Sequence, residues 1–225
     1  MRALFAPILA GATLRDRLFA CAGALFGILV TGVIGTLVLG SAALPWLAAP
    51  MGAAAVLVFA APASPLAQPW PVIGGNTLSA LTGVLAARLI PDPHLAAAVA
   101  VAAAILVMSL TRSLHPPGGA SALSAVIGGE AVRAAGFGFA LLPIGLNAVV
   151  LALCGVLFHR LSGHSYPHRP APAPGPPIAE DIDRALAETG ESFDISHEDL
   201  EALFARAARH AAERRKSIDR RKRLL

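Results

Sequence analysis

The side chains best suited to chemistry in this sequence lie around two glycine-rich breaks between apolar runs. The first break is Gly-Gly-Asn-Thr at residues 74–77, and the second is Arg-Ser-Leu-His-Pro-Pro-Gly-Gly-Ala-Ser at residues 112–121. Proline interrupts the helical hydrogen-bond ladder, and a helix that restarts after it has free N–H groups that attract anions. We therefore expect substrate contacts at Gly74, Gly75, Asn76, Thr77, Arg112, His115, Pro116, Pro117, Gly118, Gly119 and Ser121.

Arg112 and His115 are the titratable members of this set. A charge at membrane depth indicates a functional site by default, but Arg112 could equally extend its side chain to the interface from the end of the preceding helix. His115 could bind a metal, carry a proton or form a structural hydrogen bond. The last role is the commonest for a single histidine.

Enzyme chemistry finds no support in the sequence. The motifs Gly-x-Ser-x-Gly and His-Glu-x-x-His are missing, and no pair of intramembrane aspartates is present. His159, His164 and His168 follow one another closely, but no acidic residue accompanies them. We expect a protein without enzymatic activity, cofactor or bound metal.

The composition places the two breaks in a membrane protein. Of the 225 residues, 56% are hydrophobic and 14% are charged, whereas about 25% are charged in an ordinary soluble domain. Residues 1–177 contain three of the 14 acidic residues, and residues 178–225 contain the other 11. The first part is expected in the bilayer and the second in water.

Four apolar runs are candidates to cross a bilayer, which takes about 17 to 25 residues of helix. They are residues 18–40, 72–87, 94–110 and 134–158. Two further runs, residues 51–61 and 119–129, are shorter, and runs of their length are more often re-entrant or buried.

Arginines before the first run and after the last indicate that both ends of the membrane region face the cytoplasm. We therefore predict an all-α, polytopic transmembrane bundle with four crossings and two short re-entrant segments. Six crossings remain the alternative, and they place Arg88 outside instead of inside.

Residues 74–80 and 118–124 form a weak internal repeat, because Gly-Gly-Asn-Thr-Leu-Ser-Ala resembles Gly-Gly-Ala-Ser-Ala-Leu-Ser. Repeated, Gly/Pro-interrupted hydrophobic segments indicate the binding site of a transporter. The alternative is that small residues at both places only allow helices to pack closely.

The run Ser-Leu-His-Pro-Pro-Gly-Gly-Ala-Ser-Ala-Leu at residues 113–123 resembles the HPP family of bacterial and plastid membrane proteins, which is named for that His-Pro-Pro. The likeness includes residues 59–69 and 72–76 and covers roughly residues 18–160. It implies a compact multi-spanning membrane protein. Because plastid and cyanobacterial members are associated with nitrite transport, we expect a channel or transporter for a small monovalent anion, with nitrite as the first candidate.

The resemblance also sets expectations for location and regulation. The stretch before the first run is too short for a long plastid transit peptide, so we expect a bacterial inner membrane. Residues 178–215 resemble the linker that leads, in many bacterial members, to a pair of nucleotide-sensing CBS domains. The residues that follow are too few for such a pair, so we expect no nucleotide regulation.

The C-terminal part is expected to be a separate unit. We divide the chain into a transmembrane domain (1–168), a proline-rich linker (169–177) and a charged helical cytoplasmic tail (178–225). Helices are predicted at residues 178–189 and after the capping box that begins at Ser196. The basic residues of the tail favour anionic lipid headgroups as a partner over nucleic acid, because no aromatic residues are interleaved with them.

A rival function is a membrane scaffold or sensor whose tail binds a partner protein. The tail helices could also support a homo-oligomer, or form a solvated hairpin. Protein-dependent anion flux in liposomes would separate the transporter from the scaffold.

Overall fold

A computed structural model describes residues 14–40, 44–169, 183 and 194–222 of this chain, and the side chains of the last helix are described to residue 210 and at residue 213. The chain divides into two compact units, Met1–His168 and Arg169–Leu225. Over the described residues the structure is helical and contains no strand, which confirms the all-α prediction.

Four helices of the first unit are long and apolar enough to cross a membrane, as predicted. They are α1 (Leu14–Leu39), α4 (Pro93–Leu110), and the two continuous spans Pro71–Leu89 and Phe137–Ser162. Two shorter apolar helices, α2 (Pro50–Ala60) and α5 (Pro117–Ile127), have 11 residues each and correspond to the two short runs of the sequence. The remaining short elements are η2 (Pro65–Ala67), α6 (Gly129–Ala135) and α7 (Phe137–Phe139).

Two of the long spans begin with an irregular turn. One turn of π-helix, η3 (Pro71–Gly75), precedes α3 (Asn76–Leu89), and a second, η4 (Ala140–Gly145), precedes α8 (Leu146–Ser162). Unlike η3, η4 contains a kink, because Leu142 has non-helical dihedral angles (φ −132°, ψ 111°). Each turn contains a proline, which cannot donate to the helical ladder. Single π-turns inside helices are rare and are frequently found at functional sites.

Contacts between distant residues fix the direction of α1, α2 and α8. The start of α1 and the end of α8 line one cavity, so these two helices are antiparallel. The Ala48 N–H, just before α2, donates to Asn147 Oδ1 (2.8 Å), and Val58 O, near the end of α2, lies 2.9 Å from His159 Nε2. Helix α2 therefore runs in the same direction as α8.

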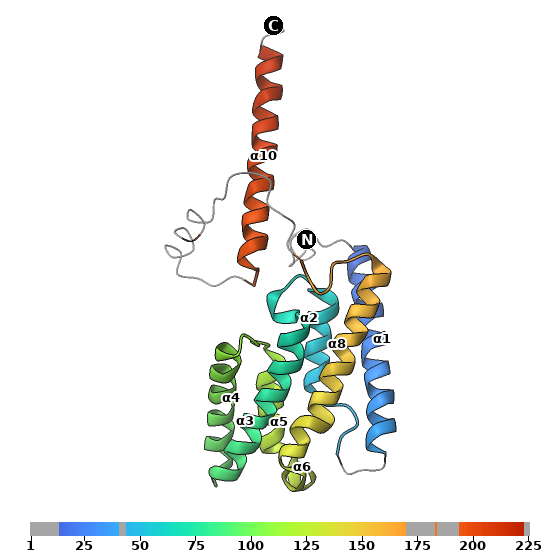
Figure 1. Ribbon diagram of the computed structural model, residues 1–225, viewed down its shortest axis with the longest axis vertical. Helices are drawn as coiled ribbons and strands as arrows, with labels where there is room; N and C mark the ends of the chain where they lie inside the picture. The colour runs from blue at the N-terminus through green and yellow to red at the C-terminus, as the bar shows by residue number, and fades with distance from the viewer. Residues whose placement is uncertain (1–13, 41–43, 170–182, 184–193, 223–225) are drawn as a thin grey trace, which may run out of the picture. The chain divides into compact units, whose positions relative to one another are not determined.

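The helices α3 and α5 also run in the same direction, with α4 between them in sequence and opposite to both. Near their starts, Ser121 Oγ donates to Asn76 Oδ1 (2.7 Å), and further along Gly83 packs against Ala122. Consecutive apolar helices from α1 to α8 thus alternate in direction, as Figure 1 shows.

The six apolar helices form two groups of three. Helices α1, α2 and α8 pack together, and α3, α4 and α5 pack together (Figure 1). Small residues permit the close packing of the second group, because α4 buries Ala96, Ala100 and Ala104 on one face. The larger core is formed mainly by α2 and α8 with parts of α3 and η4.

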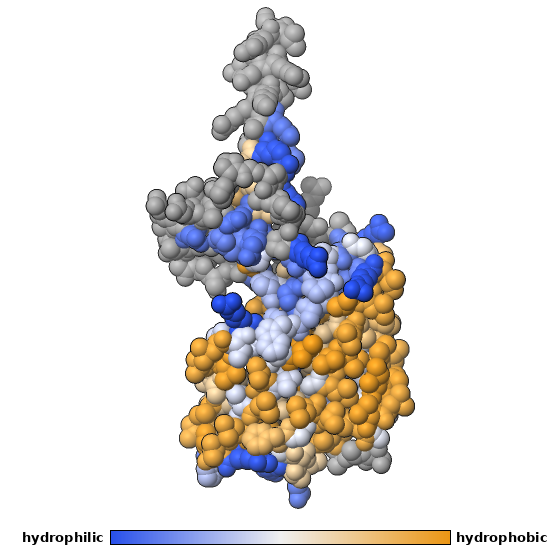
Figure 2. All heavy atoms as spheres, viewed as in Figure 1, coloured by the Kyte–Doolittle hydropathy of each residue, from blue (hydrophilic) through white to orange (hydrophobic). Residues whose placement is uncertain are grey.

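The outside of the first unit is apolar around its middle. Figure 2 shows hydrophobic side chains over most of the visible face of residues 14–169, with hydrophilic side chains gathered at its two ends. Large apolar side chains such as Leu25, Leu106 and Leu153 are more than half exposed. A soluble protein rarely exposes so large an apolar surface, so this face is suited to lipid.

The second unit contains α10 (His197–Lys222), a helix of 26 residues. It begins at the predicted capping box, since the Asp199 N–H donates to Ser196 Oγ (3.1 Å) and Ser196 Oγ donates to Asp199 Oδ2 (2.8 Å). Leu203 and Phe204 are exposed on this helix. The helix predicted at residues 178–189 lies outside the described residues except for Asp183, as does the linker beyond Arg169.

Candidate functional site

The two glycine-rich breaks meet in the interior of the bundle. A Cβ atom added to Gly118 would lie 2.8 Å from the Gly75 carbonyl oxygen and 2.8 Å from Ser79 Oγ, distances too short for any side chain. A Cβ atom added to Gly75 would lie 2.6 Å from His115 Cβ. Glycine at both positions therefore lets the backbones of η3 and α5 approach each other.

A neutral hydrogen-bond network joins the breaks. Ser121 Oγ donates to Asn76 Oδ1 (2.7 Å), and Asn76 Nδ2 donates to the Val72 carbonyl in η3 (2.8 Å). The side chains of Asn76 and Ser121 are fully buried. The network thus fixes the π-turn to the first turn of α5 without any charged group.

Two buried hydroxyl groups next to this network have no hydrogen-bond partner in the structure. They are Thr77 Oγ1 and Ser79 Oγ. Ser79 lies one helical turn from Asn76 on the same face of α3 and opposes Gly118, while Thr77 Oγ1 faces Gly145 of η4. Leaving a hydroxyl buried and unpaired costs about 1–3 kcal/mol. Such groups in a native protein call for an explanation, of which ligand binding is one.

His115 has the structural hydrogen bond that is commonest for a single histidine. Its Nδ1 lies 2.8 Å from the Leu66 carbonyl oxygen, which ties the segment before η3 to the second break. The side chain is fully buried, and burial lowers the pKa of His115 to about 4. His115 is therefore neutral near pH 7, and its Nε2 has no hydrogen-bond partner in the structure.

Arg112 lies on an exposed turn and does not enter the buried network. Its φ angle is 53°, in the left-handed region, immediately after the end of α4. The Ser113 N–H donates to the Met108 carbonyl (2.8 Å) and the Arg112 N–H to the Ser109 carbonyl (3.3 Å), as in a Schellman motif. Glycine usually occupies this position, so the arginine is held there at some cost in backbone energy.

The other predicted residues have different environments. Pro117 is buried at the start of α5, and Pro116 is exposed. Gly74 packs against the ring of Trp70, whereas a Cβ atom at Gly119 would meet nothing within 4 Å. The close backbone approach therefore occurs at Gly118 and not at its neighbour.

Sequence reasoning missed Ser79 and the turn η4. The spacing of three between Asn76 and Ser79 placed both on one helix face and was a usable signal for Ser79. For η4 the signal is Pro143, which interrupts an apolar run as Pro71 does in η3.

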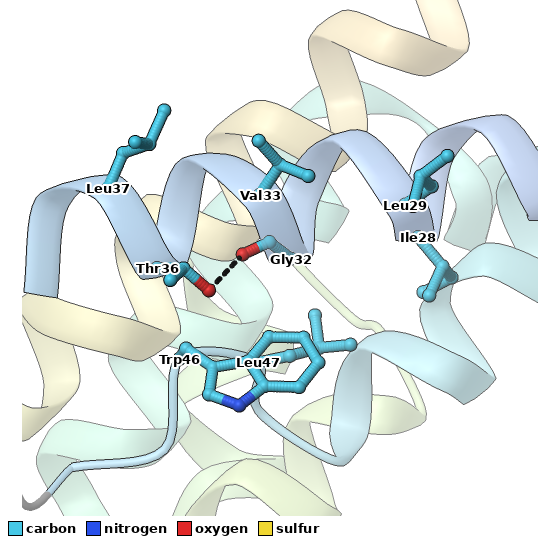
Figure 3. A pocket seen from close by; sticks show the side chains of 8 residues that line it. All are labelled: Ile28, Leu29, Gly32, Val33, Thr36, Leu37, Trp46 and Leu47. Carbon is cyan, nitrogen blue, oxygen red and sulfur yellow. Dashed lines mark hydrogen bonds between the residues drawn. The ribbon is translucent and has the colours of Figure 1, made fainter. Parts of the chain in front are cut away.

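The described cavities lie elsewhere. A groove of about 420 Å³ runs along the second half of α1 (Figure 3). It is lined by Ile28, Leu29, Gly32, Val33, Thr36, Leu37, Trp46 and Leu47. Thr36 Oγ1 donates within its own helix to the Gly32 carbonyl (3.0 Å), so the groove presents an apolar wall. Such a wall suits a hydrocarbon chain and offers little to an anion.

Two of the histidines at the end of α8 are in contact, since the ring centroids of His159 and His164 lie 5.8 Å apart. His159 Nε2 lies 2.9 Å from the Val58 carbonyl oxygen, and His164 Nδ1 lies 3.1 Å from Ser162 Oγ. In the part of the chain that the structure describes, no three His, Cys, Asp or Glu side chains could hold a metal ion together.

Comparisons with known proteins agree with the membrane architecture. The family model described as the HPP transmembrane region matches residues 10–167. A transmembrane protein of Dictyostelium discoideum is 42% identical over 120 residues, which are 51% of this chain and 42% of that protein. A second transmembrane protein of the same organism is 37% identical over 114 residues, which are 49% of this chain and 36% of that protein. The alignments thus cover less than half of each relative's length, and no solved structure matches the chain.

Proposed function

This chain belongs to the HPP transmembrane-region family and is a multi-pass membrane protein, and we propose that it carries a small monovalent anion across the membrane. Nitrite is the first candidate, because the family resemblance favours it. The fold supports a transport role, since broken helices meet inside the bundle, which is where transporters bind their substrates.

The buried pair of unpartnered hydroxyls at Thr77 and Ser79 is the observation that carries the proposal. A hydroxyl can donate to an anion. Ser79 lies opposite Gly118, where the two breaks meet, and Thr77 faces Gly145 of η4. The donors are neutral, so they would hold an anion loosely. Loose binding suits an ion that must also leave.

Arg112 has a supporting role in this proposal. Its guanidinium is exposed on the turn that precedes the second break, outside the buried network. It would raise the local concentration of anions at the entrance, and salt would screen this effect.

We further propose that the chain crosses the membrane six times, with both ends cytoplasmic, in a bacterial inner membrane. This is the alternative to the four crossings and two re-entrant segments that the sequence favours. It is preferred because α1 runs in the same direction as α3, and α4 in the same direction as α8, so the chain must return through α2 and α5. Arg88 contacts the Phe137 ring, so the end of α3 lies beside the start of the last span. The end of α4 and the end of α8 lie at the other side, because Trp70 Nε1 donates to the Thr111 carbonyl and the His168 N–H donates to Gln68 Oε1 in the same connecting segment. That side collects most of the arginines and agrees with the positive-inside rule.

The transport proposal is tested by flux into liposomes that contain the purified protein. Nitrite, nitrate, formate and chloride are supplied in turn, with potassium as the cation control and protein-free liposomes as the blank. We expect protein-dependent anion flux that is fastest for nitrite. Flux that is cation-selective, or no protein-dependent flux of any of these ions, would overturn the proposal, and the second result would favour a scaffold or sensor.

A further inference from the structure

The described bundle has the same order of apolar helices in residues 14–89 and 93–162, although η2 occurs only in the first stretch and α6 and α7 only in the second. Each stretch begins with a long helix, α1 or α4, and continues with an 11-residue helix that begins at a proline, α2 or α5. Each ends with a helix that is entered through a π-turn containing proline, η3–α3 or η4–α8, of which only η4 is kinked. The two stretches are candidates for an internal duplication.

Sequence identities accompany this order. Residues 50–55 read Pro-Met-Gly-Ala-Ala-Ala and residues 117–122 read Pro-Gly-Gly-Ala-Ser-Ala, with four identical positions in register. Residues 71–89 and 143–161 align without a gap, share their first proline, and both end in Gly-Val-Leu-x-x-Arg-Leu. This pairing differs from the weaker repeat at residues 74–80 and 118–124, which joins the third helix of one stretch to the second helix of the other.

The packing of the elements follows the same duplication. Helix α1 packs on α2 of its own stretch and on α8 of the other, and α4 packs on α5 of its own stretch and on α3 of the other. Likewise α3 packs against η4, and α8 packs against η3. The two stretches have therefore exchanged their third helices, and each π-turn packs against the third helix of the other stretch.

Glycines at equivalent positions of the two stretches make equally close contacts with a neighbouring helix. A Cβ atom at Gly83 in α3 would lie 2.3 Å from the Ala122 carbonyl oxygen in α5, and a Cβ atom at Gly155 in α8 would lie 2.5 Å from Val58 Cγ1 in α2. Gly83 and Gly155 occupy the same place in the gapless alignment. Each third helix is thus seated, through an equivalent glycine, on the short helix of the other stretch.

Buried asparagines extend the correspondence. Asn76 near the start of α3 accepts from Ser121 in α5, and Asn147 near the start of α8 accepts from the Ala48 N–H before α2. Asn147 is one residue away from the strict match of Asn76. Both asparagines are fully buried. Asn76 joins the start of α3 to α5, and Asn147 joins the start of α8 to the residues just before α2.

We propose that residues 14–89 and 93–162 are inverted repeats, and that the substrate binds where the start of α3 meets η4, at Thr77 Oγ1 opposite Gly145. Each stretch has three helices of alternating direction, so the second stretch starts on the side of the membrane opposite to the start of the first. The second stretch is therefore inverted relative to the first. The binding site rests on the proposed transport function, whereas the repeat does not. Inverted repeats of this kind enclose a central site that is exposed to each side in turn, so the protein is a carrier and not an open channel.

The repeat is tested by the sidedness of single cysteines. Pro91→Cys, Thr111→Cys and His164→Cys are made in a background with Cys21→Ser and Cys154→Ala, and each variant is labelled in oriented vesicles with a membrane-impermeant maleimide. All three positions are exposed and lie outside the helices. Inverted repeats require Thr111→Cys and His164→Cys to react from one side and Pro91→Cys from the other. Reaction of Pro91→Cys and His164→Cys from the same side would overturn the repeat, whatever the protein transports.

The carrier mechanism and the site are tested by uptake of isotope-labelled nitrite into liposomes. Unlabelled nitrite inside the liposomes should accelerate uptake by a carrier. Thr77→Val should raise the nitrite concentration for half-maximal uptake about tenfold, the equivalent of one hydrogen bond to an ion. Thr82→Val is the matched control, because Thr82 Oγ1 already donates to the Ser79 carbonyl (2.7 Å).

Two results separate this inference from the proposed function. Nitrite uptake that internal nitrite does not accelerate, or a Thr77→Val variant that behaves like Thr82→Val, overturns the carrier site and leaves anion transport standing. An absence of any nitrite uptake by the wild-type protein overturns the proposed function itself and the carrier site with it, while the cysteine labelling still decides the repeat.

Discussion

Ser121 donates a hydrogen bond of 2.7 Å to Asn76, and this bond joins two fully buried side chains that are 45 residues apart in the sequence. It links the first turn of α5 to the first turn of α3, next to the close approach of Gly118 and Gly75. The N–H groups of Gly118 and Gly119, which were expected to be free at this helix start, donate to the His115 and Pro116 carbonyls (2.8 and 3.0 Å). The hydroxyls without a partner are those of Thr77 and Ser79. The Asn76–Ser121 pair therefore holds together the region where a permeating anion would meet neutral donors.

Gly118→Ala should destabilise the fold, whereas Gly119→Ala should not. The added methyl group at Gly118 would collide with the Gly75 carbonyl and with Met108 Sδ, each 2.8 Å away, while at Gly119 it would meet open space. Overpacking of this kind costs about 1–3 kcal/mol. Thermal unfolding of both variants in detergent checks the difference, and equal midpoints would show that the backbones of the two breaks are not in contact.

The stability of the protein should fall as the pH is lowered from 6.5 towards 4. Burial lowers the pKa of His115 to about 4, below the value of 6.5 for an exposed histidine, so the unfolded chain takes up the proton first. The stabilisation is complete above pH 6.5 and the loss can reach about 3 kcal/mol by pH 4. His115→Asn retains a donor for the Leu66 carbonyl and removes the titration. Its unfolding midpoint should depend less on pH than that of the wild type, and an identical dependence in both proteins would exclude His115 as the source.

Arg112→Gly should weaken nitrite flux at low salt while raising stability. Glycine adopts the left-handed conformation at φ 53° without strain, so the substitution should gain about 1 kcal/mol of stability as it removes the charge. Arg112→Lys keeps the charge and serves as the control. The difference in flux between the two variants should shrink as ionic strength rises, because salt screens an exposed charge. A difference that persists unchanged at high salt would contradict an electrostatic role at the entrance.

Deleting residues 178–225 should leave anion flux intact. The buried network and both π-turns lie within the first unit, Met1–His168, and the deleted residues belong to the second. We expect the change to appear in oligomeric state, measured by light scattering in detergent, or in attachment to vesicles with anionic lipids, through the basic residues of α10. Loss of flux in truncated protein that inserts and folds normally would place the tail in the pathway.

The long and short helices could be predicted because their signal is local. Length and the absence of charge identify a membrane helix. Ser196 and Asp199 mark a helix start, because their hydrogen bond joins residues only three positions apart in the sequence. The contact between the breaks was also predictable in outline, since prolines and paired glycines show where helices stop and where backbones can approach.

The course of the short helices could not be decided in this way. An 11-residue apolar run has the same sequence pattern whether the helix re-enters the membrane or is part of a crossing. Contacts of Ala48 with Asn147 and of Val58 with His159 show that α2 runs along α8. The unpartnered state of Thr77 and Ser79 was equally hidden, because a hydroxyl's partner depends on packing between distant helices. The sequence indicates the charge of Arg112 but not its part in ending α4, because that part depends on the left-handed backbone conformation of the residue.

Ser79→Ala tests the central claim most directly. The substitution removes a fully buried hydroxyl that has no hydrogen-bond partner, so a purely structural role predicts equal or higher stability and unchanged nitrite flux. Ser124→Ala is the control, since Ser124 Oγ is exposed and donates to the Ala120 carbonyl of its own helix (2.8 Å). If the hydroxyl meets the anion, Ser79→Ala liposomes should show nitrite flux reduced about tenfold beside an unfolding midpoint no lower than the wild type. Nitrite flux in Ser79→Ala equal to that of Ser124→Ala and the wild type would contradict the account.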